Sequence, residues 1–190
     1  MAVVEDVQGR TISGCLYYDA FQTENLKTIM GSPQAAIRFL ELLKSSEEGD
    51  RQYFDAGVLQ DCEMDQVACV KPGVLTCSIR VTPAVQNRFG ILHGGCIASL
   101  VDIIGTAALM SMDGRPGKSV GINVSYLQAG QADSLYEVHA RVVSKGQSLA
   151  TIIVDIIDPV SKGVVSHGTH VKYMSKNDVD LGHVLFGSKL

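Results

Sequence analysis

The stretch "HGGCIASLVDIIGTAALMSM", residues 93–112, decides the fold of this chain. After its two glycines it is an almost unbroken run of Ala, Leu, Ile, Val and Met, without proline, and it is long enough for a buried helix. Polar and small residues, among them the single carboxylate Asp102, interrupt the run and leave it short of a membrane span. We therefore expect a helix at the centre of a folded domain.

Apolar and polar residues alternate on both sides of this helix, as they do in half-buried strands. Residues 74–82 show this pattern, and the Pro72-Gly73 turn before them predicts a hairpin with residues 58–70. Further strands are predicted at 119–127, 135–143, 149–157 and 164–174, the last three joined in a meander, and the predicted apolar side of the first is Val120, Ile122, Val124 and Tyr126. A sheet curled around one helix buries all these faces, so the sequence predicts an α+β fold: an antiparallel sheet wrapped around one long central helix.

The length of 190 residues suits one domain with additional segments at its ends. We expect an N-terminal extension over 1–54, one domain over 55–176 and a C-terminal tail over 177–190. The extension contains a predicted helix at about 33–46, with Ser32 as N-cap and Pro33 as its first residue. The segment that follows, up to Gly57, is expected to be a connection.

Composition excludes several function classes. The net charge of −4 is spread along the chain without a basic stripe, so no nucleic-acid partner is expected. The five cysteines are odd in number and form no C-x-x-C pair, which favours reduced thiols inside the cell. The first residues lack the charged and apolar regions of a secretory signal.

The last three residues, Ser188, Lys189 and Leu190, match the C-terminal tripeptide that the peroxisomal import receptor reads. They predict that this receptor is a partner and that the protein resides in the peroxisome. The alternative is residence in the cytosol.

Gly94 and Gly95 open the predicted helix, where free backbone N–H groups and the positive end of the helix dipole can polarise a carbonyl. Asp102 lies further along, with small residues beside it on the same helical face. A buried, unpaired carboxylate costs several kcal/mol, and the sequence offers no evident partner for it. Asp102 is therefore a candidate functional residue.

The two features cannot act on one atom from one helix, because eight residues of helix separate Gly94 from Asp102 by about 12 Å. If both belong to one site, a second copy of the chain must supply the carboxylate. The spacing predicts a homodimer with two composite sites.

Two other motifs are read as unrelated to catalysis. "GKS" at 117–119 resembles the end of a phosphate-binding loop, but Met112 stands where that loop needs its first glycine. His167 and His170, three apart in a strand, should point to opposite faces and make a poor metal pair. We predict no metal site and no cofactor.

With these residues in hand, the chain resembles the hotdog-fold acyl-CoA thioesterases, in the group of thioesterase superfamily member 2, acyl-CoA thioesterase 13 and the phenylacetate-pathway enzymes. The resemblance covers about residues 55–175. It rests on N-x-x-G-x-x-H-G-G-x-x-x-x-x-x-D at 87–102 and on S-V-G-I-N-V-S-Y at 119–126. It implies the hotdog fold, with the N-terminal helical extension as a departure from the family's short form.

The resemblance also implies roles for single residues. Gly94 looks like the backbone donor to the thioester carbonyl, and Asn87 is similar to the family's amide at that carbonyl. Asp102 resembles the carboxylate that activates water, and Ser119 its hydroxyl helper. His93 is implied to shape the loop, with Gly95 in support.

The function implied is hydrolysis of an acyl-CoA thioester to a free acid and CoA, by a homodimer or homotetramer. The CoA phosphates are expected to meet Arg115, Lys118 or Lys145. Two alternatives stay open: a hotdog enoyl-CoA hydratase, and a dimer that binds acyl-CoA without turnover. Composition does not distinguish an aliphatic from an aromatic acyl group.

Overall fold

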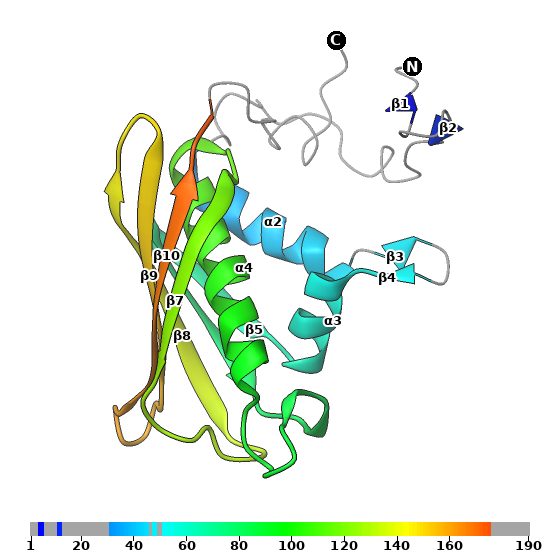
Figure 1. Ribbon diagram of the computed structural model, residues 1–190, viewed down its shortest axis with the longest axis vertical. Helices are drawn as coiled ribbons and strands as arrows, with labels where there is room; N and C mark the ends of the chain where they lie inside the picture. The colour runs from blue at the N-terminus through cyan, green and yellow to red at the C-terminus, as the bar shows by residue number, and fades with distance from the viewer. Residues whose placement is uncertain (1–3, 6–10, 13–30, 46, 49–50, 176–190) are drawn as a thin grey trace.

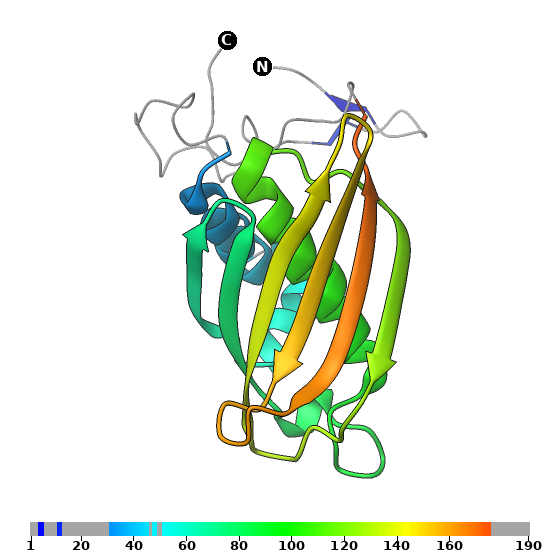
Figure 2. The ribbon, with the colours of Figure 1, turned by 90° about the vertical axis from the view of Figure 1, so that its left-hand side faces the viewer.

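The central helix predicted from the sequence is present in the computed structural model as α4 (Gly94–Asp113), packed against one face of a six-stranded antiparallel sheet (Figure 1). The structure describes residues 4–5, 11–12, 31–45, 47–48 and 51–175. Figure 2 shows the curved sheet from its outer side, with the helices behind it. The α+β prediction of a sheet wrapped around one long helix is confirmed.

The sheet order is β5-β6-β8-β9-β10-β7, with every neighbouring pair antiparallel. The strands are β5 (Asp65–Lys71), β6 (Val74–Arg80), β7 (Lys118–Tyr126), β8 (Leu135–Lys145), β9 (Leu149–Ile157) and β10 (Val164–Tyr173). Two short pairs stand apart from it: β1 (Val4–Glu5) with β2 (Thr11–Ile12), and β3 (Glu47–Glu48) with β4 (Arg51–Gln52). The 3-10 helix η1 (Pro83–Val85) lies in the connection from β6 to α4. The predicted β8-β9-β10 meander is present, and the Pro72-Gly73 turn joins β5 to β6.

The core lies between α4 and the concave face of the sheet. Close approach of helix and sheet depends on Gly168 in β10, since a Cβ there would lie 2.5 Å from a methyl carbon of Val101. By length and mean hydropathy (1.7) α4 would qualify as a membrane span, yet 67% of its most apolar window is buried inside the fold. Its apolar character therefore serves the core.

The predicted N-terminal helix is present as α2 (Pro33–Ser45), which packs on α4. Its buried residues, Ala35, Ala36, Phe39 and Leu40, join the same core as α4. The buried side is therefore centred on Phe39 and Leu40, while Ile37 and Leu43 are only partly buried. The boundaries predicted at 54/55 and 176/177 stay predictions, and the tail from residue 176 lies outside the described residues.

The prediction for residues 58–70 is wrong in part. The chain forms a second helix, α3 (Phe54–Asp61), where a connection and the start of a strand were expected, and only β5 pairs with β6. The buried residues Ala56, Leu59 and Cys62 are three apart and thus follow a helical period. The short apolar run was compatible with both structures, and packing against α2 and α4 favours the helix.

The apolar side predicted for β7 is right only in part: Val124 packs against the core, but Val120, Ile122 and Tyr126 are exposed, because β7 is the edge strand of the sheet. Strict alternation is broken as well. The pairing with β10 matches His170 to Ile122 and Lys172 to Ser119, with a register shift between Val171 and Lys172. This β-bulge inserts one extra residue in β7, so an odd-numbered and an even-numbered residue, Ser119 and Ile122, face α4 together.

Candidate active site

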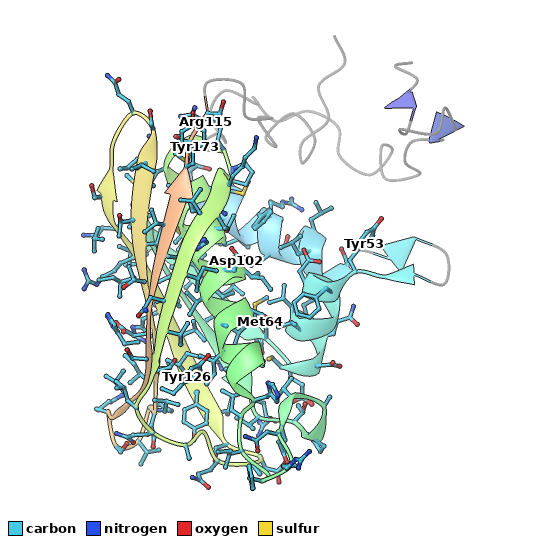
Figure 3. The ribbon with its side chains drawn as sticks, viewed as in Figure 1. Tyr53, Met64, Asp102, Arg115, Tyr126 and Tyr173 are labelled. Carbon is cyan, nitrogen blue, oxygen red and sulfur yellow. The ribbon has the colours of Figure 1, made fainter. Side chains whose placement is uncertain are left out.

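Asp102 lies halfway along α4, facing the edge of the sheet (Figure 3). Its side chain is 45% exposed in the single chain. Oδ1 accepts a hydrogen bond from Ser119 Oγ at 2.8 Å and lies 3.2 Å from His170 Nε2. The expectation of a buried, unpartnered carboxylate is therefore corrected: Asp102 has two polar partners, and one side is open to solvent.

The β-bulge gives Ser119 its place in this group. Without the extra residue, Ser119 would project from the face of β7 opposite to Ile122, away from α4. The structure thus brings together two of the predicted site residues, Asp102 and Ser119. Their catalytic roles remain predictions.

His170 is a site residue that sequence reasoning missed. It is fully buried in β10, and its Nε2 lies 2.9 Å from Ser119 Oγ. Its strand shows one signal: the residues facing α4 include the buried polar residues Ser166, His170 and Lys172, where an ordinary core strand would place apolar side chains. His167 does lie on the other face, 2.6 Å from Asp155.

Burial, reinforced by the charge of Lys172, lowers the pKa of His170 to about 4, although Asp102 opposes the shift. The imidazole is therefore neutral near pH 7. Because the single hydroxyl proton of Ser119 is donated to Asp102, Nε2 must carry the imidazole proton and donate it to Ser119 Oγ. The result is a directed chain of hydrogen bonds from His170 through Ser119 to Oδ1 of Asp102.

A pocket of about 530 Å³ opens beside Asp102. Its lining combines side chains of α2, α3, α4, β7 and β10. The apolar members are Phe39, Leu43, Phe54, Ala98, Ile103 and Ile122, and the polar members are Asp55, Ser99, Asp102, Thr106, Ser119 and Lys172. Lys172 is almost fully buried and donates to Thr106 Oγ1 at 2.6 Å. The pocket can hold an apolar group against a carboxylate at its rim.

The other predicted group lies at the N-terminal end of α4. His93 is the N-cap, and its Nδ1 accepts a hydrogen bond from the backbone N–H of Gly95 at 2.9 Å. Among the described residues no partner for the Gly94 N–H is found. Tyr126, labelled near this end in Figure 3, donates to the carbonyl of Gly94 and packs its ring where a Gly94 side chain would be. The Gly94 N–H is therefore available as a backbone donor at this end of the helix.

Asn87 lies in the loop that leads to this helix end. Its Oδ1 accepts hydrogen bonds from the backbone N–H groups of Phe89 (2.9 Å) and Ile91 (3.4 Å). The amide oxygen therefore shapes the loop, and the NH₂ group is the end of the side chain that can donate to a ligand.

The three predicted CoA-binding cations gather at the opposite end of α4. Arg115 and Lys145 both contact Asp113 Oδ2, at 2.8 and 2.9 Å. Burial acts to raise the pKa of Asp113, but the hydrogen bonds from Lys145 and Arg115 outweigh it, and the pKa is lowered. Lys118, at the start of β7, is exposed. Within the described part of the chain, no group of three or more His, Cys, Asp or Glu residues could hold a metal ion.

Comparison with known proteins adds independent information. Residues 89–165 match the family model of the Thioesterase superfamily. The chain is 34% identical over 104 residues to acyl-coenzyme A thioesterase 13 of Mus musculus, covering 54% of this chain and 74% of that protein.

Two crystal structures of thioesterase superfamily member 2 show a similar fold. The zebrafish protein gives a TM-score of 0.65 at 29% identity, over 80% of this chain and all of that one. The Mus musculus protein gives 0.62 at 28% identity, over 74% of this chain and 97% of that one.

The buried imidazole predicts how stability depends on pH. The unfolded chain binds a proton at His170 below about pH 6.5, whereas the folded chain does so only below about pH 4. Since the unfolded state holds more protons between these values, the free energy of unfolding should fall by up to about 3 kcal/mol as pH drops from 6.5 to 4. Urea unfolding at pH 7 and pH 4.5 measures this loss.

His170→Gln is the matched variant, because its amide can still donate to Ser119 but does not titrate. Groups that do not interact with His170 titrate alike in both proteins, so the difference between the two pH profiles isolates His170 and its direct neighbours. Identical profiles would contradict the assignment of a neutral, buried imidazole.

Proposed function

This chain belongs to the thioesterase superfamily, and on that basis we propose that it hydrolyses acyl-CoA thioesters to a free acid and CoA. The observation that carries the proposal is the placement of Asp102, with one carboxylate oxygen held by a chain of hydrogen bonds and the side chain open to a largely apolar pocket. The relationship to acyl-coenzyme A thioesterase 13 supports the same substrate class.

Asp102 is proposed to be the general base. Both of its polar contacts end on Oδ1, so Oδ2 is available to accept a hydrogen bond from water. The water oxygen attacks the thioester carbon while its proton passes to Asp102. The C–S bond then breaks, and the CoA sulfur leaves as the thiol after receiving a proton. Ser119 holds the carboxylate from the pocket wall, and His170, fully buried behind Ser119, acts as a positioning residue.

Gly94 is proposed to stabilise the charge that develops on the thioester oxygen. Its backbone N–H lies at the positive end of a helix of 20 residues, and the NH₂ group of Asn87 adds a second donor from the neighbouring loop. Donors of this kind contribute when they are fixed before the reaction, which the Gly95–His93 cap ensures for this helix turn.

The active unit is proposed to be a homodimer, or a homotetramer built from it. Gly94 and Asp102 are eight residues apart on one straight helix, about 12 Å along its axis, so one subunit cannot bring both to one carbonyl. The edge strand β7 is nine residues long and carries the exposed side chains Val120, Ile122 and Tyr126. Such an edge favours antiparallel pairing with a second copy about a two-fold axis.

The pocket beside Asp102 is proposed to take the acyl group. Phe39 and Leu43 of α2 and Phe54 of α3 form its wall on the side of the N-terminal segment. For the CoA phosphates we retain Lys118, Arg115 and Lys145 as candidates. Only Lys118 is without a carboxylate contact among the described residues, so it is the first to test.

Two alternatives are less well supported. An enoyl-CoA hydratase needs a histidine at the substrate, and the histidine beside Asp102 is fully buried behind Ser119. A dimer that only binds acyl-CoA would have no need for a carboxylate oriented by a hydroxyl that is itself held by a buried imidazole.

Asp102→Asn tests the proposal, because it removes the base while keeping the shape of the side chain. We expect kcat for acyl-CoA hydrolysis to fall by about 10²- to 10⁴-fold with little change in KM. Release of free thiol from acyl-CoA esters of graded chain length and from one aromatic ester gives the rates and ranks the acyl groups.

The variant's oligomeric state and melting temperature serve as controls, and enoyl-CoA hydration is assayed in parallel. Full thioesterase activity in a folded Asp102→Asn protein would refute the role of the carboxylate. Hydration of enoyl-CoA without thioester cleavage would establish the hydratase instead.

We also propose that the protein acts in the peroxisome. The support is the C-terminal Ser188-Lys189-Leu190, which lies outside the described residues. Fusion of a fluorescent protein after Leu190 should move the chain to the cytosol, whereas the same fusion at the N-terminus should leave it in peroxisomes. Cytosolic fluorescence from both fusions would contradict the address.

A further inference from the structure

Two thiols outside the proposed site lie against each other. The Sγ atoms of Cys62 and Cys96 are 3.3 Å apart, although 34 positions separate the residues in the chain. Cys62 is fully buried at the C-terminal end of α3, and Cys96 is partly exposed in the first turn of α4. Both are free thiols in this structure. The contact therefore joins the short helix α3 to the helix that carries Asp102.

The two sulfurs differ in reactivity. The hydrogen bond from Cys62 lowers the pKa of Cys96 despite the opposing effect of burial, and the third position of a helix also favours a thiolate. The same hydrogen bond, together with burial, raises the pKa of Cys62. Cys96 is thus suited to attack an oxidant, and Cys62 is placed to attack the oxidised sulfur of Cys96 because its own sulfur lies 3.3 Å away.

We propose that Cys62 and Cys96 form a reversible disulfide whose oxidant is a hydroperoxide. In the first step the Cys96 thiolate attacks the terminal peroxide oxygen: an S–O bond forms, the O–O bond breaks, and the remaining oxygen leaves as water or alcohol after taking a proton. In the second step Cys62 sulfur attacks the sulfenic sulfur: the S–S bond forms, the S–O bond breaks, and water leaves with the Cys62 proton. Two thiols lose two electrons in total, and the peroxide gains them.

The structure needs little adjustment for this reaction. The sulfurs lie 3.3 Å apart and must approach to about 2.0 Å. The crosslink ties α3 to α4, and α3 begins with Phe54 and Asp55, which line the pocket beside Asp102. Oxidation therefore fixes one wall of that pocket to the helix that carries the carboxylate.

The chain supplies its own control cysteines. Cys77 is buried in β6, and burial raises its pKa to about 12. Cys69 is partly buried, burial raises its pKa, and its thiol donates to the Lys71 carbonyl. Neither is expected to react ahead of Cys96. Cys15 lies outside the described residues and is replaced by serine in all test proteins.

The test treats the full-length Cys15→Ser protein with hydrogen peroxide at increasing ratios. We expect the intact mass to decrease by two hydrogen atoms, peptide mapping to identify the Cys62–Cys96 crosslink, and dithiothreitol to restore the original mass. Because the crosslink closes a loop between two packed helices, the melting temperature of the oxidised protein should rise by about 5 to 10 °C.

Cys69→Ser should leave the crosslink unchanged, while Cys62→Ser should stop the reaction at a sulfenic acid on Cys96 that a dione reagent traps. If buried serine destabilises the fold, Cys62→Ala serves the same purpose. The proposal is overturned if mapping finds no Cys62–Cys96 peptide, if the disulfide joins two subunits, or if Cys69 oxidises first. No thioester is assayed, so these results are independent of the proposed hydrolysis.

Discussion

The rigid rise of α4 is the constraint on which the rest of the molecule depends. Its 20 residues are held straight between the concave face of the sheet and α2, and Gly168 allows the helix to approach β10 closely. The same rigidity keeps Asp102 about 12 Å from the N-terminal donors at Gly94. One copy of α4 therefore cannot bring both groups to one thioester, and the proposed hydrolysis requires a dimer.

The polar partners of Asp102 come from the sheet and not from α4. The bulge in β7 turns Ser119 toward α4, and β10 places His170 behind it without exposing the ring. Because the imidazole is neutral, it orients Ser119 by a hydrogen bond and adds no positive charge that would weaken the carboxylate as a base. The burial that lowers the pKa of His170 thus also suits it to a positioning role.

Much of this could be predicted from the sequence, for physical reasons that differ between elements. The long apolar run of α4 predicts a helix, and the alternation in β8 and β9 predicts strands, because the length and period of these segments fit no other structure. Residues 54–61 were predicted as a connection and the start of a strand, because a short apolar run fits a strand and a helix equally. Contacts with α2 favour the helix α3 that is present. The β7 bulge and the placement of His170 beside Asp102 could not be predicted, since both depend on which strand pairs with which and in what register. The Ser119–Asp102 contact was anticipated only through the family resemblance.

The central claim is that each site takes its carboxylate from one subunit and its backbone donor from the other, and mixed dimers test it most directly. Asp102→Asn removes the base, and Gly94→Pro removes the N–H at the first helical position, where helices accept proline and where the extended backbone of His93 suits the residue before a proline. A Cβ at this position would lie 3.3 Å from the Tyr126 ring, so the ring must move by a few tenths of an ångström, and the melting temperature of the variant serves as the control. Purified dimers with one subunit of each kind contain one site with both functional groups intact and one with neither. The account predicts about half of the wild-type activity in these mixed dimers, although each variant alone is inactive. Mixed dimers as inactive as the two parent variants would contradict it, since that result requires both groups to act from one chain.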